Sequence, residues 1–259
     1  MTQTNNTPPE RELTLITEAG RTLLENGGEV FRAQQTMEIM ARSLGVEGFH
    51  VYVITNGIFA SAGDSPLTEI RHIPCTAVNL SRVEAVNELS RELADGNLDL
   101  PAAEDRLQQI RTMPEYGTRV GTLAGALGSA CFAYLFGGGP ADMAAAFVAG
   151  VVEQMVTRLC VRLHISRIFS DIVAAAAAMA VALLCHGLFP VVNANYAIIG
   201  ALMVLTPGVA LVMGIRDFIN GDYLSGTIRL INALFIAGCL ACGVGITYTL
   251  AHRIGGGLL

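Results

Sequence analysis

Five apolar segments, each about as long as a lipid bilayer is thick, follow one another in the second half of the chain. They cover residues 118–136, 141–163, 168–189, 195–215 and 227–250. A helix crosses roughly 30 Å of hydrocarbon with about 20 apolar residues. Because a soluble helical core does not need five such segments in succession, the sequence predicts a membrane protein with a five-helix transmembrane bundle.

Charged residues divide the chain in the same way. Only 15% of its 259 residues are charged, against roughly 25% in a soluble domain. Residues 1–119 hold 17 of the 22 acidic and 10 of the 16 basic residues, so this part has a net charge of −7. A nucleic-acid partner requires clustered positive charge, and we therefore expect none. Lysine is absent, which excludes a lysine Schiff base and a P-loop lysine.

The polar first part predicts a small cytosolic α+β domain over residues 10–115, after a disordered tail at 1–9, and leaves residues 116–259 as the transmembrane domain. Apolar residues recur at helical spacing from Leu13 to Leu24, and two glycines follow. Asn56-Gly57 is a hairpin signal between two β-branched runs. The other expected elements are a helix over 29–44, strands over 49–55, 58–62 and 67–73, and helices over 79–94 and 101–112.

Arginine placement indicates the topology of the expected spans. Arginines precede the first span and lie in the connections from the second to the third and from the fourth to the fifth, while the other two connections have none. Under the positive-inside rule this places the N-terminal domain in the cytoplasm and the C-terminus outside. The first residues, MTQTNNTPPERE, do not resemble a signal peptide.

The second apolar segment contains Glu153, Gln154 and Arg158. Ionisable groups inside a bilayer are costly, and they usually face a cavity or a partner. Gln154 and Arg158 share a helix face, and Arg158 is also placed to anchor the helix at the inner interface. A carboxyl group in a low dielectric tends to keep its proton, so Glu153 is a candidate for a polar transport path and for proton coupling, or else for a pairing across helices.

The fourth segment contains Thr206-Pro207-Gly208. Proline removes a backbone donor and clashes with the preceding turn, which predicts a broken helix. Transporters bind small charged substrates at such breaks, although a packing kink would leave the same pattern. A polar cluster follows, with Arg216, Asp217, Asn220 and Asp222. It predicts either a solvated loop or an inner vestibule that meets the substrate or the N-terminal domain.

Other recurring residues point to packing. Gly121 and Gly125 form a pair of the GxxxG type, which is typical of helix contacts. Cys239 and Cys242 lie within the fifth segment and have no further ligands nearby. The five histidines have no metal-ligand spacing. We expect no metal, no cofactor and no catalytic residues.

The order of these features resembles the threonine/serine exporter family, and more narrowly its shorter, split members. The resemblance rests on the cytosolic domain followed by five spans, on PGV at 207–209 and on RDFINGDYLSG at 216–226. The segment FRAQQTMEIMARSLGVEGFHVYVITNGIFAS at 31–61 resembles the family's N-terminal signature. The resemblance covers about residues 12–252.

This resemblance implies a subunit of a secondary exporter in a bacterial inner membrane, driven by the proton-motive force. Its substrates would be small polar metabolites, above all threonine and serine. In split systems a second, smaller membrane protein supplies the remaining spans, and some such pairs export succinate instead. Five spans suit a chain that awaits a partner or forms a homo-oligomer.

Two other classes of function stay open. A non-transporting regulatory subunit would require the polar groups of the second and fourth segments to be packed away, whereas a cavity lined by Glu153 and Thr206 would favour transport. A membrane-tethered hydrolase would have to use Ser61, Asp64 and His72, whose spacing does not have the geometry of a nucleophile elbow.

Overall fold

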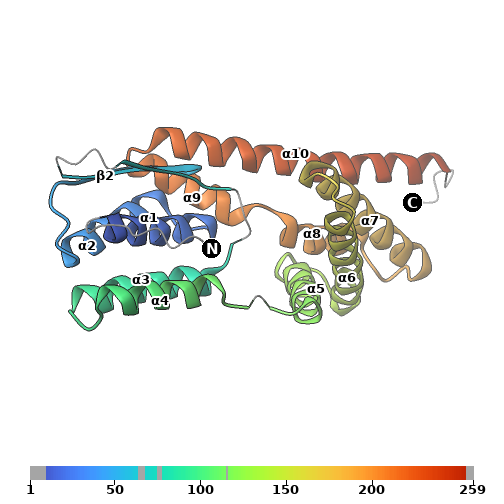
Figure 1. Ribbon diagram of the computed structural model, residues 1–259. Coiled ribbons are helices and arrows are strands. Elements are labelled where there is room, and N and C mark those ends of the chain that lie inside the picture. Colours follow the sequence, from blue (N-terminus) through green and yellow to red (C-terminus); the bar gives the residue numbers. More distant parts are fainter. Residues whose placement is uncertain (1–9, 64–67, 75–77, 115, 255–259) are drawn as a thin grey trace. The chain divides into compact units, whose positions relative to one another are not determined.

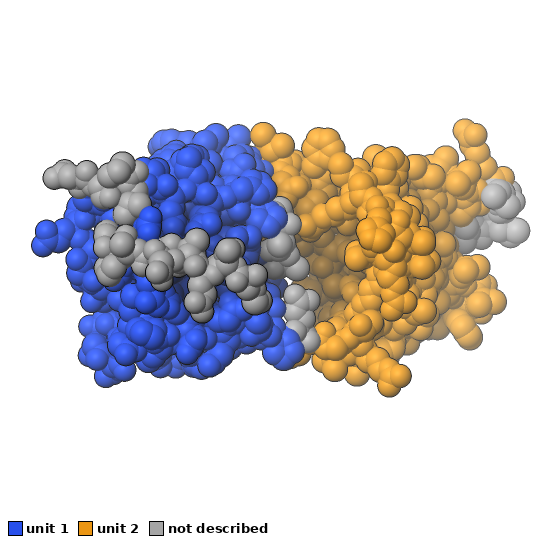
Figure 2. All heavy atoms as spheres, viewed as in Figure 1, with its two compact units in different colours: residues 1–114, 211–230 blue, residues 115–210, 231–259 orange. Residues whose placement is uncertain are grey.

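The chain forms two compact units, which Figure 2 shows in separate colours. The first consists of residues 1–114 together with 211–230, and the second of residues 115–210 together with 231–259. The computed structural model describes residues 10–63, 68–74, 78–114 and 116–254. The tail expected at residues 1–9 lies outside the described residues.

The first unit has the helices and strands that its periodicity predicts. Its three strands form one antiparallel sheet in the order β1-β2-β3, and the Asn56-Gly57 hairpin signal lies where β1 turns into β2. The element bounds lie within a few residues of the expected ones: α1 (Glu10–Glu25), α2 (Val30–Ser43), β1 (Phe49–Ile54), β2 (Gly57–Ala62), β3 (Thr68–His72), α3 (Leu80–Ala94) and α4 (Leu100–Arg111).

These elements lie in three layers. In Figure 1 the sheet lies over α1 and α2, which in turn lie over α3 and α4. Side chains alternate between the two faces of each strand, so one face of the sheet carries the residues that pack on α1 and α2. The shared core is aliphatic and includes the buried side chains of Leu13, Ile16, Val30, Met37, Ile58 and Leu89.

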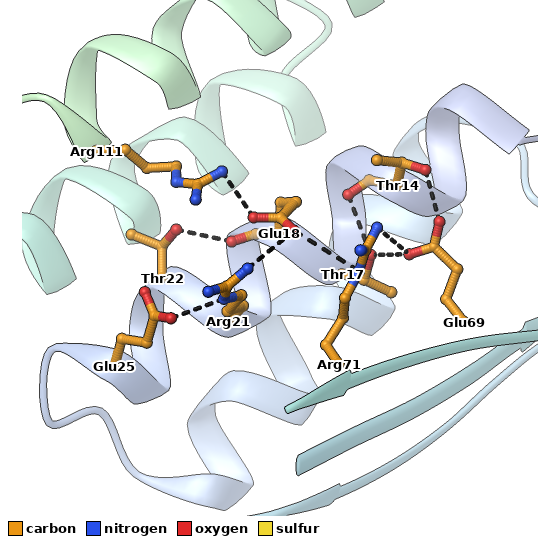
Figure 3. Close-up of polar contacts among 9 residues, drawn as sticks. All are labelled: Thr14, Thr17, Glu18, Arg21, Thr22, Glu25, Glu69, Arg71 and Arg111. Carbon is orange, nitrogen blue, oxygen red and sulfur yellow. Dashed lines mark hydrogen bonds and ion pairs between the residues drawn. The ribbon is translucent and has the colours of Figure 1, made fainter. Parts of the chain in front are cut away.

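A polar network joins the edge strand β3 to α1 (Figure 3). Thr14 Oγ1 donates to the Glu69 carboxylate at 2.6 Å, and Thr17 Oγ1 donates to the other oxygen of the same carboxylate. Arg71 Nη2 lies 3.1 Å from Glu69. Charged side chains that point inward from an edge strand oppose edge-to-edge pairing with other sheets, so this network protects β3 as well as docking it.

The same network continues to α4 through Glu18, which lies on α1. Arg111 Nη1 is 2.7 Å from the Glu18 carboxylate, and Arg21 and Arg71 lie 3.6 Å from it. Arg21 also pairs with Glu25 one turn away, at 2.7 Å. The acidic and basic groups of the network compensate one another, so we regard it as structural rather than as a ligand site.

The second unit is helical. It contains α5 (Thr118–Leu135), α6 (Pro140–Arg162), α7 (Arg167–Leu188), α8 (Ala194–Leu205) and the greater part of α10 (Tyr223–Ile254), while α9 (Gly208–Ile219) begins in it. Among the described residues, three helices are long and apolar enough to cross a membrane, namely α6, α7 and α10. The bent pair of α8 and α9 would make a fourth span if it acts as one.

The structure therefore gives three or four membrane-capable segments among the described residues, where the sequence predicts five. The difference lies in α5, which has 18 residues. Glycines at three of its positions, together with Arg119 and two threonines, lower its mean hydropathy. A membrane protein with a small three-stranded sheet is confirmed, whereas the count of five spans stays a prediction.

Residues 211–230 pack with the N-terminal residues rather than with the helices that flank them in the sequence. They form a tight helical hairpin, in which Gly221 makes the turn at φ +87°. The two helices cross so closely that a Cβ on Gly226 would lie 2.9 Å from the Gly214 carbonyl oxygen. Such an approach is possible only for glycine, and it keeps the hairpin compact.

Candidate functional site

One face of α5 is lined with glycines, and α6 packs on it. A Cβ on Gly121 would lie 3.1 Å from Arg158 Nη2, and one on Gly125 would lie 3.1 Å from Gln154 Cγ. Arg158 Nη1 also donates to Thr122 Oγ1. The expectation that the two glycines mediate helix packing is confirmed, and Gln154 and Arg158 share the face of α6 that contacts them.

A second face of α5 receives α8. A Cβ on Gly200 would lie within 3 Å of Ser129 O and of Ala133 Cβ, and one on Gly128 would lie 3.6 Å from Val204 Cγ2. Helices α6 and α8 also contact each other. Helices α6 and α8 therefore pack around α5 through small residues that let the three backbones approach closely.

These contacts bring Glu153 and the break after α8 to the same level of the second unit. Helices α6 and α8 both run antiparallel to α5. Residue numbers therefore decrease along α6 and α8 in the direction in which they increase along α5. Gln154 meets Gly125, and Val204 meets Gly128, one turn along. Thr206 lies two residues beyond Val204 and so reaches about the level of Gly125 and Glu153.

Glu153 is completely buried, with an exposed fraction of 0%. Among the described residues neither of its carboxylate oxygens has a hydrogen bond of ordinary geometry, although the side-chain amide of Gln154 lies close enough to interact. Burying an ionised carboxyl group without a partner costs several kcal/mol. A buried carboxyl group without such a partner is therefore a candidate functional group, which takes up a proton or a ligand.

Asp142, on the same helix, shows what a purely structural carboxylate looks like. One of its oxygens accepts from Gly139 N at 2.8 Å, at the start of α6, and the other accepts from Asn193 N at 2.6 Å. Its burial is therefore fully compensated. The contrast with Glu153 separates a capping residue from a candidate functional one.

The helix break falls where the sequence predicts it. α8 ends at Leu205, α9 begins at Gly208, and the two are bent by 55°. Thr206 Oγ1 donates to the Leu202 carbonyl at 2.9 Å, and Gly208 N donates to Thr206 O at 2.8 Å rather than continuing the helix. Because Pro207 has no N–H, the carbonyls of the last turn of α8 lose helical partners and are available to other donors.

Two apolar cavities lie among the described residues of the second unit. One is lined by residues of α7 and α10, among them Leu183 and Thr247, and the other by residues of α6 and α7 and of the connection to α8, among them Val148 and Phe189. Within the described residues neither is lined by Glu153 or Thr206. In this conformation Glu153 is packed away, as a regulatory subunit would require, whereas Thr206 is exposed.

The polar cluster after the break belongs to the first unit. Arg216 forms an ion pair with Glu29, and Arg229 Nη2 donates to the Gly28 carbonyl oxygen at 3.0 Å. Asp217 pairs with Arg229 across the hairpin. Arg216 and Arg229 thus contact residues 28–29, next to the start of α2.

Asn220 and Asp222 lie in the turn of the same hairpin. Asn220 N donates to Arg216 O, and Asp222 N donates to Asp217 O at 2.8 Å. These are backbone contacts that any residue could make at these positions. Glu153, Gln154 and the break lie in the second unit, so the expected site residues fall into two groups.

The described residues do not support the hydrolase hypothesis. Ser61 pairs with Thr68 and His72 pairs with Gly57, so the serine and the histidine lie at opposite ends of the sheet. Asp64 lies outside the described residues.

Two buried acids that the sequence analysis did not single out are Asp142 and Asp171. Asp171 lies 4.0 Å from Arg167 on the same helix. An acid three residues after Gly139, with Pro140 between, is a helix-start signal that could have identified Asp142.

Comparison with known proteins is consistent with a membrane chain. A family model described as "Putative threonine/serine exporter" matches residues 14–251. The chain is 23% identical over 237 residues to pheromone-regulated membrane protein 10 of Pichia sorbitophila, an alignment that covers 88% of this chain. The chain spans 23% of the length of that relative. No solved structure matches it significantly.

Proposed function

The chain belongs to the threonine/serine exporter family, and from this premise we propose that it is a subunit of a secondary exporter for small polar metabolites, with threonine and serine as the first candidates. Export would be driven by the proton-motive force. The observation that carries the proposal is Glu153, which is fully buried and which, among the described residues, has no hydrogen bond of ordinary geometry to either carboxylate oxygen.

Glu153 meets the needs of proton coupling. An unpaired carboxyl group in an apolar bundle is far more stable neutral than charged, so its protonation changes the energy of the buried state. Alternating access couples transport to such a change when the group is buried in one conformation and reaches water in another. A buried Glu153 then belongs to an occluded conformation, in which the proton is retained.

The break at Thr206-Pro207-Gly208 supplies the groups that a small zwitterion would need. Backbone carbonyls released at the break can accept from a substrate ammonium group, and the N-terminus of α9 can receive a carboxylate. At the same level, Gly125 and Gly128 of α5 let Gln154 of α6 and Val204 of α8 approach closely. The proposed site therefore has Glu153 and Gln154 on one side and the break on the other.

The chain would cross the membrane five times, with α5 as the first span and the N-terminal residues in the cytoplasm. Arginine placement supports this topology, because arginines lie in alternate connections. A smaller membrane protein of the same system, or further copies of the chain, would complete the bundle. A dicarboxylate such as succinate is the second candidate substrate, because the α9 N-terminus and Arg158 favour anions.

A regulatory subunit is the competing proposal, because within the described residues neither apolar cavity is lined by Glu153 or Thr206. The two are distinguished by efflux from liposomes that contain the purified chain, with and without its companion protein. Liposomes preloaded with threonine, serine or succinate are given a proton gradient, and efflux of each is followed. Gradient-dependent efflux of one substrate supports the exporter, and an absence of efflux for all three, with the companion present, supports the regulatory subunit.

A further inference from the structure

The outer face of the three-stranded sheet is exposed and apolar at its centre. The register aligns three outward-facing side chains, one from each strand, in a row: Tyr52 opposite Phe59, and Phe59 opposite Ile70. They are 57%, 41% and 66% exposed. The rings of Tyr52 and Phe59 pack against each other with centroids 6.3 Å apart. The other face of the same sheet is occupied by α1 and α2, and among the described residues the row of Tyr52, Phe59 and Ile70 stays exposed.

The outer face differs from its surroundings in charge. Its two flanking rows are His50, Ser61 and Thr68 on one side and Ile54, Gly57 and His72 on the other. None of these nine described positions is an aspartate, a glutamate or an arginine. The charged residues of β3, Glu69 and Arg71, point to the inner face, where they bind α1.

We infer that this face is a self-association surface, on which a second copy of the chain packs row against row. The part of the chain that carries the sheet has a net charge of −7, so two copies repel each other over most of their surfaces. The outer face is a place where two such copies can meet without apposing like charges. Because Phe59 is central among the nine positions, a two-fold axis that lies between the two faces, over Phe59 and parallel to β2, brings Tyr52 of one copy onto Ile70 of the other.

A membrane surface is a less suitable occupant. Inner leaflets carry anionic lipids and attract clusters of basic residues, and the outer face has none in the described positions. An amphipathic membrane-binding surface also combines its apolar residues with basic ones, whereas this unit is acidic. Charge therefore favours the second copy.

The area of the outer face determines how strong we expect the contact between two copies to be. Three strands about 4.8 Å apart, over five residues of about 3.3 Å, give a patch of roughly 250 Å². A stable soluble dimer buries about 800 Å² on each partner, so this contact alone would be weak. Two copies held in one membrane have a high effective concentration, and a weak contact between them can then be populated. The inference does not depend on whether the chain transports anything.

Site-specific photo-cross-linking of the full chain in liposomes of neutral lipid tests this surface. The photo-reactive residue benzoylphenylalanine replaces Phe59, and the products are separated on a denaturing gel. We expect a covalent dimer of the chain. In the same background Ile70→Asp should lower its yield by at least about fivefold, as a loss of one to two kcal/mol implies, and Tyr52→Asp should do the same.

Leu80→Asp is the matched control, because Leu80 is 65% exposed at the start of α3, outside the sheet. It should leave the cross-link unchanged. Thermal unfolding of each variant checks that the fold is retained, and outward-facing substitutions should leave the midpoint near that of the wild type. Cross-links to lipid alone, no cross-links, or a dimer yield that Ile70→Asp and Tyr52→Asp leave intact would each overturn the inference.

Discussion

Asp217 and Arg229 form a buried ion pair across the α9–α10 hairpin, with the arginine Nε 3.1 Å from the aspartate carboxylate. The Asp217 side chain is completely buried. Arg229 also donates to the Gly28 carbonyl oxygen, so the pair joins the hairpin to the N-terminal residues. Removing one partner of such a pair leaves the other charge buried and uncompensated.

We therefore predict that Asp217→Asn destabilises the first unit by about 3 kcal/mol. The thermal unfolding midpoint of the purified chain measures the effect. Asp222→Asn is the control, because Asp222 lies in the same hairpin, is partly exposed and contacts Asp217 through its backbone. A midpoint that falls equally in the two variants would show that the ion pair has no special importance.

The close packing of α8 on α5 leads to a second prediction. Gly200→Ala introduces a methyl group within 3 Å of Ser129 O and Ala133 Cβ, and should destabilise the second unit by about 1–3 kcal/mol. Gly187→Ala is the matched helical control, since no atom lies within 4 Å of its added Cβ. The temperature at which each variant aggregates in detergent compares them, and equal temperatures for the two variants would contradict this packing.

Much of the fold could be predicted from the sequence, because local patterns determine it. Apolar periodicity, glycine stops and the Asn56-Gly57 turn located the helices and strands of the first unit to within a few residues. The break after Leu205 follows directly from the chemistry of Pro207. These features depend on residues that are close in the sequence, so a single sequence is sufficient to predict them.

The rest depends on contacts between distant residues. The pairing of Arg216 with Glu29 joins positions 187 apart, and no local pattern distinguishes it from a solvated loop. Similarly, Asp142 and Glu153 are both acids in one apolar helix. Only the tertiary structure shows that the backbone N–H of Asn193 donates to Asp142. Only the tertiary structure shows, too, that Glu153 has no hydrogen bond of ordinary geometry among the described residues. The sequence shows Glu153 as an ionisable residue in an apolar segment, and the tertiary structure is needed to establish its burial.

Arginine placement predicts a topology that labelling can test. We expect a cysteine introduced by His164→Cys, in the connection between α6 and α7, to be inaccessible to impermeant maleimide in intact cells and accessible after lysis. The chain's native cysteines are first replaced, because Cys131 and Cys242 are exposed. Labelling of residue 164 from outside would reverse the proposed orientation.

The helix break provides a sharper test of the site. Pro207→Ala with Gly208→Ala restores a backbone donor and raises helix propensity by roughly 3 and 1 kcal/mol respectively. If the break forms the substrate site, the double variant should insert and assemble normally but lose efflux. Normal efflux from a correctly assembled variant would mean that the break is a packing kink and that the substrate site lies elsewhere, with the Arg216–Asp222 cluster as the next candidate.

The central claim is that Glu153 carries the coupling proton, and Glu153→Gln tests it most directly. The amide has the same shape and stays neutral, so the variant should fold like the wild type. The measurement is threonine efflux from preloaded liposomes, with an imposed proton gradient and without one. We predict that the gradient accelerates efflux through the wild-type protein but not through the variant, while exchange in the absence of a gradient persists. Gradient-driven efflux at the wild-type rate through Glu153→Gln would contradict the account and remove Glu153 from the mechanism.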